Sequence, residues 1–406
     1  MEEKKLVPKL RFPGFTEPWE QRKLGDVVGI TSGFMGDSLL SDGKYHLTRI
    51  ETIADGIVDE NRVGYSNEKP NDMYLLKHGD ILYSNINSIS HMGKVAKYQG
   101  NSPLYHGINL LRLQPENNIN SDFLLYLLNT EKCRNWAKTR ANQAVSQASI
   151  NQSLLTTQEI AISSFEEQKK IGDYFRNLDH LITLHQRKLE HLKLKKKSLL
   201  QKLFPKEGEV YPELRFPGFT DPWEQRKLSD ILVERNEQQV ETSEYPLMSF
   251  VQGIGVTPKG ERYDRSFLVL DQSKKYKRTE LGDFIYSSNN LETGSIGINK
   301  TGKAVISPVY SIFYGVSIGD SEFIGIMSLL PGFIAKMIRF RKGVVYGQWR
   351  IHEKDFLDIS VSIPSVDERT KITKLILSIE ELITLHQRKL EHLQLLKKAL
   401  LQQLFV

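Results

Sequence analysis

The sequence of 406 residues and 46.7 kDa is too long for one ordinary hydrophobic core and predicts two or three domains. Its 39% hydrophobic and 26% charged residues are typical of a globular protein and exclude a disordered or fibrous chain. The formal charge of +6 is concentrated in two segments, since 181–204 carries +6, 382–405 carries +3, and the rest sums to −3. Net charge alone is therefore weak support for nucleic-acid binding.

The first ten residues, MEEKKLVPKL, contain no apolar run of the kind a secretory signal needs. The most apolar stretch, Phe323 to Ile338, is interrupted by Pro331 and Lys336 and is too short to span a bilayer. The single cysteine, Cys133, cannot form an internal disulfide or a cysteine-based metal site. We therefore expect a cytoplasmic protein.

An internal duplication organises the chain. Residues 8–27 (PKLRFPGFTEPWEQRKLGDV) return at 212–231 with sixteen of twenty positions identical. Residues 181–204 (LITLHQRKLEHLKLKKKSLLQKLF) return at 382–405 with twenty of twenty-four identical. The protein is thus predicted to be two tandem repeats of about 200 residues, each a domain, and not a solenoid of short units.

Within each repeat the middle has diverged while the ends have not. Segments 28–163 and 232–364 contain short β-rich runs, such as Asp80–Ser84 and Ile359–Ile363, and helical stretches such as Asp122–Lys138. Each middle segment is predicted to be an α+β globular domain.

Long amphipathic helices are predicted to close each repeat. From Ile171 to Leu203 and from Ile372 to Leu404, residues recur at alternating steps of four and three, and eight of ten positions in each copy are apolar. This period is typical of a coiled coil. A parallel pair would stack His185 on His386 and like-charged lysines on each other, whereas an antiparallel pair gives each polar core residue an apolar partner. We therefore predict antiparallel helices and a pseudo-two-fold internal duplication.

Motifs that could carry catalysis are near misses. Segment 297–304 matches a phosphate-binding P-loop except at Ala304, where a hydroxyl should bind Mg²⁺, and we interpret it as a β-hairpin turn. Glu167-Gln168-Lys169 has the Glu-x-Lys ending of a common nuclease site, but it opens a helix, where a glutamate favours the helix dipole. We predict no catalytic residue and no metal site in this chain.

The order of the repeated motifs carries a resemblance to a known family. At Trp19 and Trp223 the sequence Trp-Glu is followed, after three intervening residues, by Leu, and Gly-Asp-hydrophobic follows at 79 and 282. A strand ending at Ile162 or Ile363 then precedes the long helix and its opening Glu-Gln-Lys-Lys-Ile (167–171) or Glu-Arg-Thr-Lys-Ile (368–372). Over essentially its whole length the chain resembles the specificity subunit of type I restriction–modification enzymes. Two departures are Arg369, where glutamine is usual, and Ser163, where proline is usual.

The resemblance implies an architecture of two target-recognition domains and two spacer helices, at 1–163, 164–205, 206–364 and 365–406. Each recognition domain would read one half of an interrupted double-stranded DNA sequence, and the helices would set the spacing and dock partner subunits. Two modification subunits would supply S-adenosylmethionine-dependent N6-adenine methylation, and two restriction subunits would use ATP and Mg²⁺. The chain itself would be non-catalytic and would hold no cofactor.

Candidate DNA-reading residues follow from the duplication, because segments that are nearly identical cannot distinguish two half-sites. Readers should lie in loops of the diverged domains, with side chains that suit base edges. The candidates of the first repeat are Ser84, Asn85, Asn87, Ser88, His91, Lys94, Arg140, Asn142 and Gln143. Those of the second repeat are Ser288, Asn289, Asn290, Lys300, Lys303, Tyr346, Gln348, Trp349 and Arg350.

A second interpretation from another functional class is a scaffold whose two domains bind proteins and not DNA. The affinity of a DNA reader falls steeply as salt rises, whereas a scaffold with a coiled-coil core responds little. Salt dependence therefore separates the two interpretations.

Overall fold

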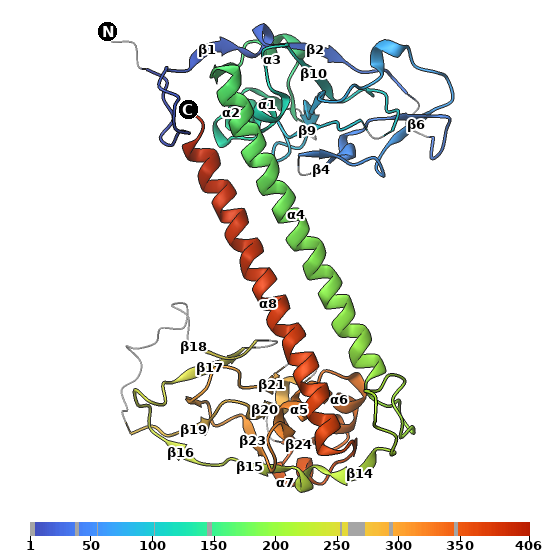
Figure 1. Cartoon of the computed structure of the whole chain (residues 1–406), viewed down its shortest axis with the longest axis vertical. Helices are drawn as coiled ribbons and strands as arrows, with labels where there is room; N and C mark the ends of the chain where they lie inside the picture. Colours follow the sequence, from blue (N-terminus) through green and yellow to red (C-terminus); the bar gives the residue numbers. More distant parts are fainter. Residues whose placement is uncertain are drawn as a thin grey trace. The chain divides into compact units, whose positions relative to one another are not determined.

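The computed structural model describes residues 5–36, 40–54, 56–100, 102–143, 148–251, 254–258, 273–291, 295–344 and 348–406. Two compact units divide the chain. Unit 1 comprises residues 1–187 together with 387–406, and unit 2 comprises residues 188–386. Each unit therefore contains one diverged domain and parts of both long helices, α4 (Phe165–Lys202) and α8 (Val366–Gln403) (Figure 1).

Unit 1 is an α+β structure built on a six-stranded sheet of order β2-β10-β7-β9-β5-β4. Two short sheets, β1-β13 and β3-β6, and a three-stranded sheet, β11-β12-β8, complete its strands. The elements are β1 (Glu20–Lys23), β2 (Val28–Ser32), β3 (Tyr45–Leu47), β4 (Ile53–Ala54), β5 (Ile57–Val58), β6 (Gly64–Ser66), β7 (Ile81–Tyr83), β8 (Ile86–Asn87), β9 (Val95–Lys97), β10 (Leu111–Pro115), α1 (Ser121–Leu128), α2 (Glu131–Arg140), β11 (Asn142–Gln143), β12 (Ala148–Ser149), α3 (Gln152–Thr156) and β13 (Glu159–Ile162).

Unit 2 repeats the central part of this sheet as β15-β23-β20-β21, the counterpart of β2-β10-β7-β9. The diverged segments therefore keep one framework despite their different sequences. Its elements are β14 (Glu224–Lys227), β15 (Leu232–Glu234), β16 (Gln238–Gln239), β17 (Met248–Val251), β18 (Gly255–Pro258), β19 (Tyr276–Thr279), β20 (Phe284–Tyr286), β21 (Ile296–Ile298), β22 (Ala304–Ile306), β23 (Ser311–Gly315), α5 (Asp320–Met327), α6 (Pro331–Ile338), β24 (Lys342–Val344), β25 (Gln348–Arg350), α7 (Glu353–Leu357) and β26 (Ser360–Ile363).

An aromatic cluster joins the repeated tryptophan of each unit to a helix end. In unit 1, Trp19 packs edge-on against Phe123 at 5.6 Å and Phe405 at 6.1 Å between ring centroids. In unit 2, Trp223 packs against Phe204 at 5.7 Å and Phe323 at 6.0 Å. Because buried aromatic pairs add to the area that they remove from water, these clusters fasten the helix ends to the two cores.

Within each unit the two helices run past each other in opposite directions. In unit 1, Phe405 stacks on Phe175 near the start of α4. Lys397 of α8 forms a 2.6 Å ion pair with Asp179 of α4 there, and in unit 2 Lys196 of α4 forms a 2.6 Å ion pair with Glu380 of α8. The antiparallel pairing was expected to give each core lysine an apolar partner for its stem, and the structure adds a carboxylate beside the seam that pairs with its charge.

The helical stretch predicted over Asp122–Lys138 is two helices, α1 and α2. Thr130 ends the continuity, since its hydroxyl donates to the Leu127 carbonyl at 2.7 Å and accepts from Cys133 N at 3.4 Å. A threonine that caps a new helix in this way favours a break in the chain direction. The apolar period alone does not reveal this cap.

Candidate nucleic-acid interface

The two groups of candidate residues in the first repeat meet in the three-stranded sheet of unit 1. Asn87 of β8 pairs with Ala148 of β12, and Asn142 of β11 pairs with Ser149 of β12. Strand pairs thereby join the segment 84–94 to residues 142–143 and 148–149, about fifty positions further along the sequence. We call this sheet and its flanking described residues 84–94, 140–143 and 148–150 the unit 1 reading surface.

Buried amide and hydroxyl groups anchor the unit 1 reading surface. Asn85 is 8% exposed. Its Nδ2 donates to the Ile150 backbone carbonyl at 3.1 Å, and its backbone carbonyl accepts from Ile150 N at 2.8 Å. Ser84 is 1% exposed and accepts from Asn87 Nδ2 at 3.2 Å. These two candidates hold the surface together from within.

The remaining candidates of this group leave polar atoms near solvent. Ser88 and His91 are exposed, and the Ser88 hydroxyl lies 2.8 Å from His91 Nδ1. Arg140 is exposed and its guanidinium lies 5.1 Å above the Trp136 ring, while Asn142 is exposed and Asn87 and Lys94 are half-buried. The side chain of Gln143 lies outside the described residues.

Unit 2 joins its corresponding loops through side chains. Asn289 Oδ1 accepts from Trp349 N at 2.7 Å, and the Ser288 hydroxyl accepts from Ile351 N at 2.9 Å. This connection presents the Trp349 side chain at 50% exposure, beside the exposed Arg350. We call residues 287–290 with 348–351 the unit 2 reading surface.

Glu353 lies close to the unit 2 reading surface and interacts electrostatically with its residue Arg350. It accepts from the Ser311 hydroxyl at 2.8 Å and lies 3.8 Å from both Lys277 Nζ and Arg350 Nη2. Burial alone would raise the pKa of Glu353, but hydrogen bonds, including that from Ser311, and the nearby cations more than offset it, so the pKa is lowered. The carboxylate therefore stays charged and can restrain Arg350.

Lys300 and Lys303 are not brought to the unit 2 reading surface by any described contact. They lie at a turn where Asn299 Oδ1 accepts from the backbone NH groups of 301 and 302. Lys300 is paired with Glu380, and Lys303 with Glu244, whose hydrogen bond raises the pKa of Lys303. The flanking strands β21 and β22 pair with β20 and β19 and not with each other, so the hairpin predicted for 297–304 is wrong although the turn is present.

Three further candidates cannot be placed by their side chains. Tyr346 lies outside the described residues, and so do the side chains of Asn290 and Gln348. The backbone of Gln348 pairs with Val344 in the antiparallel strand pair β24-β25, which also contains Trp349 and Arg350. This strand pair corresponds to β11-β12 of unit 1.

The repeated ends of each unit form a buried clasp that sequence reasoning did not find. Glu167 is 1% exposed and accepts from Arg11 Nε at 2.7 Å, Arg11 Nη2 at 2.9 Å and Trp19 Nε1 at 3.1 Å. Glu368 accepts from Arg215 Nε and Nη2 at 2.7 and 2.8 Å. The sequence signal for this clasp is that both repeats carry the same arginine and the same glutamate. The hydrogen bonds give Glu167 a structural role in place of a catalytic one.

The residues after these glutamates explain one departure from the family pattern. Gln168 Oε1 accepts from Asn120 N at 2.9 Å, which ties α4 to the beginning of α1. Arg369 instead forms a 2.8 Å ion pair with Asp320, the first residue of α5. Arginine and glutamine thus make the same connection by different chemistry.

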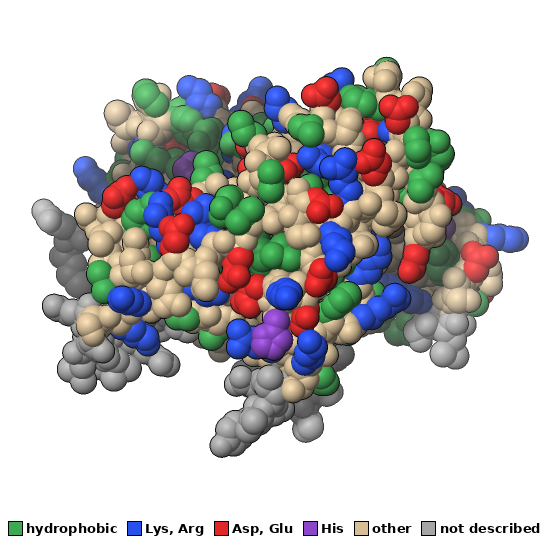
Figure 2. Space-filling view, turned by 90° about the horizontal axis from the view of Figure 1, so that it is seen from below, with side chains coloured by type: hydrophobic (Ala, Val, Ile, Leu, Met, Phe, Trp, Pro, Cys, Tyr) green, Lys and Arg blue, Asp and Glu red, His purple; other side chains and the backbone are tan. Residues whose placement is uncertain are grey.

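Charge by itself does not outline an interface on the face drawn in Figure 2, where basic and acidic side chains are interspersed. The described residues hold no group of three or more His, Cys, Asp or Glu side chains placed to bind a metal ion. Within those same residues no single helix is long and apolar enough to cross a bilayer, although α5 and α6 meet that test as a pair bent by 93°.

Comparison with known proteins places the chain in a family. Residues 16–194 match the type I restriction modification DNA specificity domain. The chain is 30% identical, over 95% of its length and 92% of the relative's, to a putative type I restriction enzyme MjaX specificity subunit from Methanocaldococcus jannaschii. It is 24% identical, over 97% and 92%, to the type I restriction enzyme MjaVIII specificity subunit of the same organism.

The fold agrees with that relationship. A crystal structure of the S subunit of a type I restriction–modification system from M. genitalium superposes with a TM-score of 0.65 and 15% identity, covering 99% of both chains. The chain belongs to the family of type I restriction–modification specificity subunits.

Proposed function

We propose that this chain reads DNA, with the unit 1 reading surface contacting one half of a bipartite site and the unit 2 reading surface contacting the other. The observation that carries the proposal is that each unit uses the same sheet framework to join two sequence-diverged loops at one surface. A shared framework with divergent polar loops is what two readers of different sequences require.

The proposed base contacts come from the side chains that remain exposed or half-buried. Asn87 and Asn142 suit adenine, which offers a donor and an acceptor in the major groove, and Lys94, Arg140 and Arg350 suit guanine or phosphates. The exposed Trp349 offers an apolar surface to a thymine methyl group or a sugar. Ser84, Asn85, Ser288 and Asn289 act by positioning the loops.

Partner docking is the proposed role of the outer faces of the helices. Leu181, Leu184 and Leu194 are 43%, 53% and 68% exposed, and their repeat counterparts Leu382, Leu385 and Leu395 are 44%, 46% and 68% exposed. Coiled-coil pairing does not require leucine at these outward positions. Each unit thus presents its own set of exposed leucines, Leu181, Leu184 and Leu395 in unit 1 and Leu194, Leu382 and Leu385 in unit 2. Two such sets fit two copies of one partner, and we assign them to two modification subunits.

The spacing of the half-sites is proposed to come from the helices. The ion pairs Lys397–Asp179 in unit 1 and Lys196–Glu380 in unit 2 support an antiparallel coiled coil with pseudo-two-fold symmetry. In the assembled enzyme, modification subunits would supply S-adenosylmethionine-dependent methylation and two restriction subunits would use ATP and Mg²⁺. This chain would contribute recognition without a cofactor, in the cytoplasm.

Methyladenine maps of genomic DNA test the proposal. One map is made from cells that express the chain with its modification subunits, and the other from cells that lack only the chain. The expected result is one interrupted motif whose methylation depends on the chain. Loss of the chain without loss of any methylated motif would contradict the proposal, as would DNA binding that does not weaken when salt rises.

A further inference from the structure

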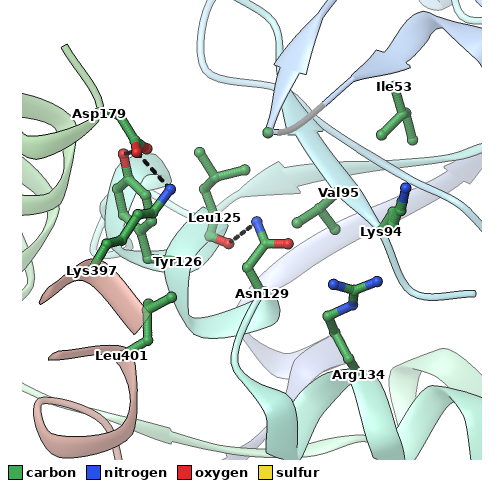
Figure 3. Close-up of a pocket in the computed structure, with 11 residues that line it drawn as sticks. Ile53, Lys94, Val95, Leu125, Tyr126, Asn129, Arg134, Asp179, Lys397 and Leu401 are labelled. Carbon is green, nitrogen blue, oxygen red and sulfur yellow. Dashed lines mark hydrogen bonds and ion pairs between the residues drawn. The ribbon is translucent and has the colours of Figure 1, made fainter. Parts of the chain in front are cut away.

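A groove in unit 1 lies between helix α2 and the last turns of α8. It consists of two adjoining pockets of about 260 and about 530 Å³, which share the lining residues Asn129, Arg134 and Leu401. The smaller pocket also includes Lys94 and the Lys397–Asp179 pair (Figure 3). The larger one continues along α2 to Lys138 and along α8 to Lys398.

The groove is basic. Lys94, Lys138 and Lys398 line it and have no acidic partner among the described residues, and the one described side-chain bond of Arg134 is a 3.5 Å contact from Nη2 to the Ser90 carbonyl. Two carboxylate side chains line it, Asp179 and Glu131, and the first is already paired with Lys397. Lys132 also lines the larger pocket, where its Nζ donates to the Val406 backbone oxygen at 3.3 Å. Besides the paired Lys397, five cations therefore face the groove with little compensation.

The groove adjoins the unit 1 reading surface. Arg134 reaches Ser90 in the loop that carries Ser88 and His91, and Lys94 ends that loop. Gly93 lets the loop approach α2 this closely, since its φ is +73° and an added Cβ would lie 2.9 Å from Ala137 Cβ. A ligand in the groove would thus touch the same loop that the proposed DNA half-site touches.

Unit 2 lacks the basic residues of α2. Helix α6 is the counterpart of α2, because its buried Phe333 and Met337 take the places of Cys133 and Ala137. On the same alignment Ile334 and Ile338 stand where unit 1 has Arg134 and Lys138. The cations of α2 are therefore not part of the duplicated framework, which points to a role in unit 1 only.

We propose that this groove binds backbone phosphates of DNA next to the half-site that unit 1 reads, and that unit 2 has no equivalent phosphate site. The inference rests on the proposed function and adds an asymmetry to it. Lysine and arginine without acidic partners are the groups that bind phosphates and release counterions. The loop shared with the reading surface makes the bound phosphates continuous with the base contacts.

The test uses the full chain co-purified with its modification subunits and a duplex that carries the mapped target. A triple variant, Lys94→Gln with Lys138→Gln and Lys398→Gln, removes three charges and keeps the Arg134 contact to Ser90. The slope of log K against log salt is expected to become shallower by about 2 to 3, because each neutralised phosphate contributes about 0.9. A control variant, Lys5→Gln with Lys9→Gln and Lys23→Gln, removes three exposed lysines of the same unit and should leave the slope unchanged.

A second measurement locates the phosphates. Neutral methylphosphonates, substituted singly along the duplex, should weaken binding of the unaltered protein but not of the triple variant at positions beside the unit 1 half-site. The groove inference is overturned if the two proteins have equal slopes, if the same phosphates matter to both, or if the triple variant fails only to assemble with its modification subunits, which would make the groove a protein-docking site. Absence of any sequence-dependent DNA binding by the unaltered complex would instead overturn the proposed function.

Discussion

Glu167 and Glu368 occupy equivalent places in the two repeats but make different numbers of hydrogen bonds. Both carboxylates bind an arginine through two nitrogens, yet only Glu167 also accepts from a tryptophan, since Trp223 Nε1 is buried without a hydrogen-bond partner in the described structure. A buried hydrogen bond to a charged group contributes roughly 1.5 to 3 kcal/mol. The two clasps should therefore differ in strength.

We predict that Glu167→Gln destabilises unit 1 by about 2 to 3 kcal/mol, because Arg11 loses its counter-charge and Trp19 loses an ionic acceptor. Glu368→Gln is the matched variant and should cost about 1 kcal/mol less. Urea unfolding followed by tryptophan fluorescence measures both. Equal losses would show that the tryptophan bond adds nothing to stability.

A second residue-scale prediction concerns acid. Burial alone would raise the pKa of Glu380, but its ion pairs with Lys196 and Lys300 more than offset burial, so the pKa lies below its ordinary value. A carboxylate with a lowered pKa contributes stability that is present above its unfolded pKa of about 4.3 and is lost as pH falls through the folded value. As the pH drops below about 4.5, the melting temperature of the Glu380→Gln variant should therefore fall less steeply than that of the unaltered protein.

The control for that experiment is Glu381→Gln, an exposed glutamate one position along the helix. It should follow the unaltered protein across the whole pH range. A Glu380→Gln curve that also follows the unaltered protein would mean that the ion pairs do not affect acid stability.

Sequence could nominate polar loop residues but not separate readers from supports. Asn85 and Asn87 are equivalent candidates in the sequence, yet the side-chain amide of Asn85 donates to the buried Ile150 carbonyl, whereas Asn87 lies nearer solvent. The difference depends on a partner 65 positions away, which no local pattern contains. The sequence does not reveal that Arg134 and Lys138 line a groove, because their positions in the helical period are typical of an ordinary solvated face.

At the scale of elements, the break between α1 and α2 depends on one hydroxyl. We predict that Thr130→Ala costs about 1 to 2 kcal/mol, since it removes the cap of α2 and leaves the Leu127 carbonyl without that donor. Thr130→Ser keeps the hydroxyl and should recover most of the loss. Urea midpoints of the three proteins test this, and an unchanged midpoint for the alanine variant would show that packing alone sets the break.

The long helices were the elements most accessible from sequence, because ten consecutive core positions repeat with one period. Their ion pairs were not, since Asp179 and Glu380 lie beside the apolar seam and read as surface residues. Lys196 with Glu380 and Lys397 with Asp179 are related by the same offset of 201 positions. The duplication itself was therefore the signal that could have found them.

At the scale of the whole molecule, the two reading surfaces should act independently. We predict that replacing residues 232–364 with the equivalent domain of a relative changes one half of the methylated motif and leaves the other half intact. The reason is that the two reading surfaces belong to different compact units with separate cores. Genomic methyladenine mapping measures the outcome.

The reciprocal exchange of residues 28–163 is the control, and it should alter the opposite half. If either exchange changed both halves, the reading surfaces would depend on each other and the modular interpretation would be wrong.

Unit 1 takes its last helical segment, 387–406, from far along the chain, and this has a consequence for synthesis on the ribosome. Trp19, Phe123 and Phe175 emerge early, but Phe405, which covers them, is added only after all of unit 2. At roughly 5 to 20 residues per second, an apolar face of the first half stays open for on the order of 10 to 40 seconds. Newly made chains thus pass through a stage in which chaperones, or the matching segment of a second nascent chain, can occupy that face.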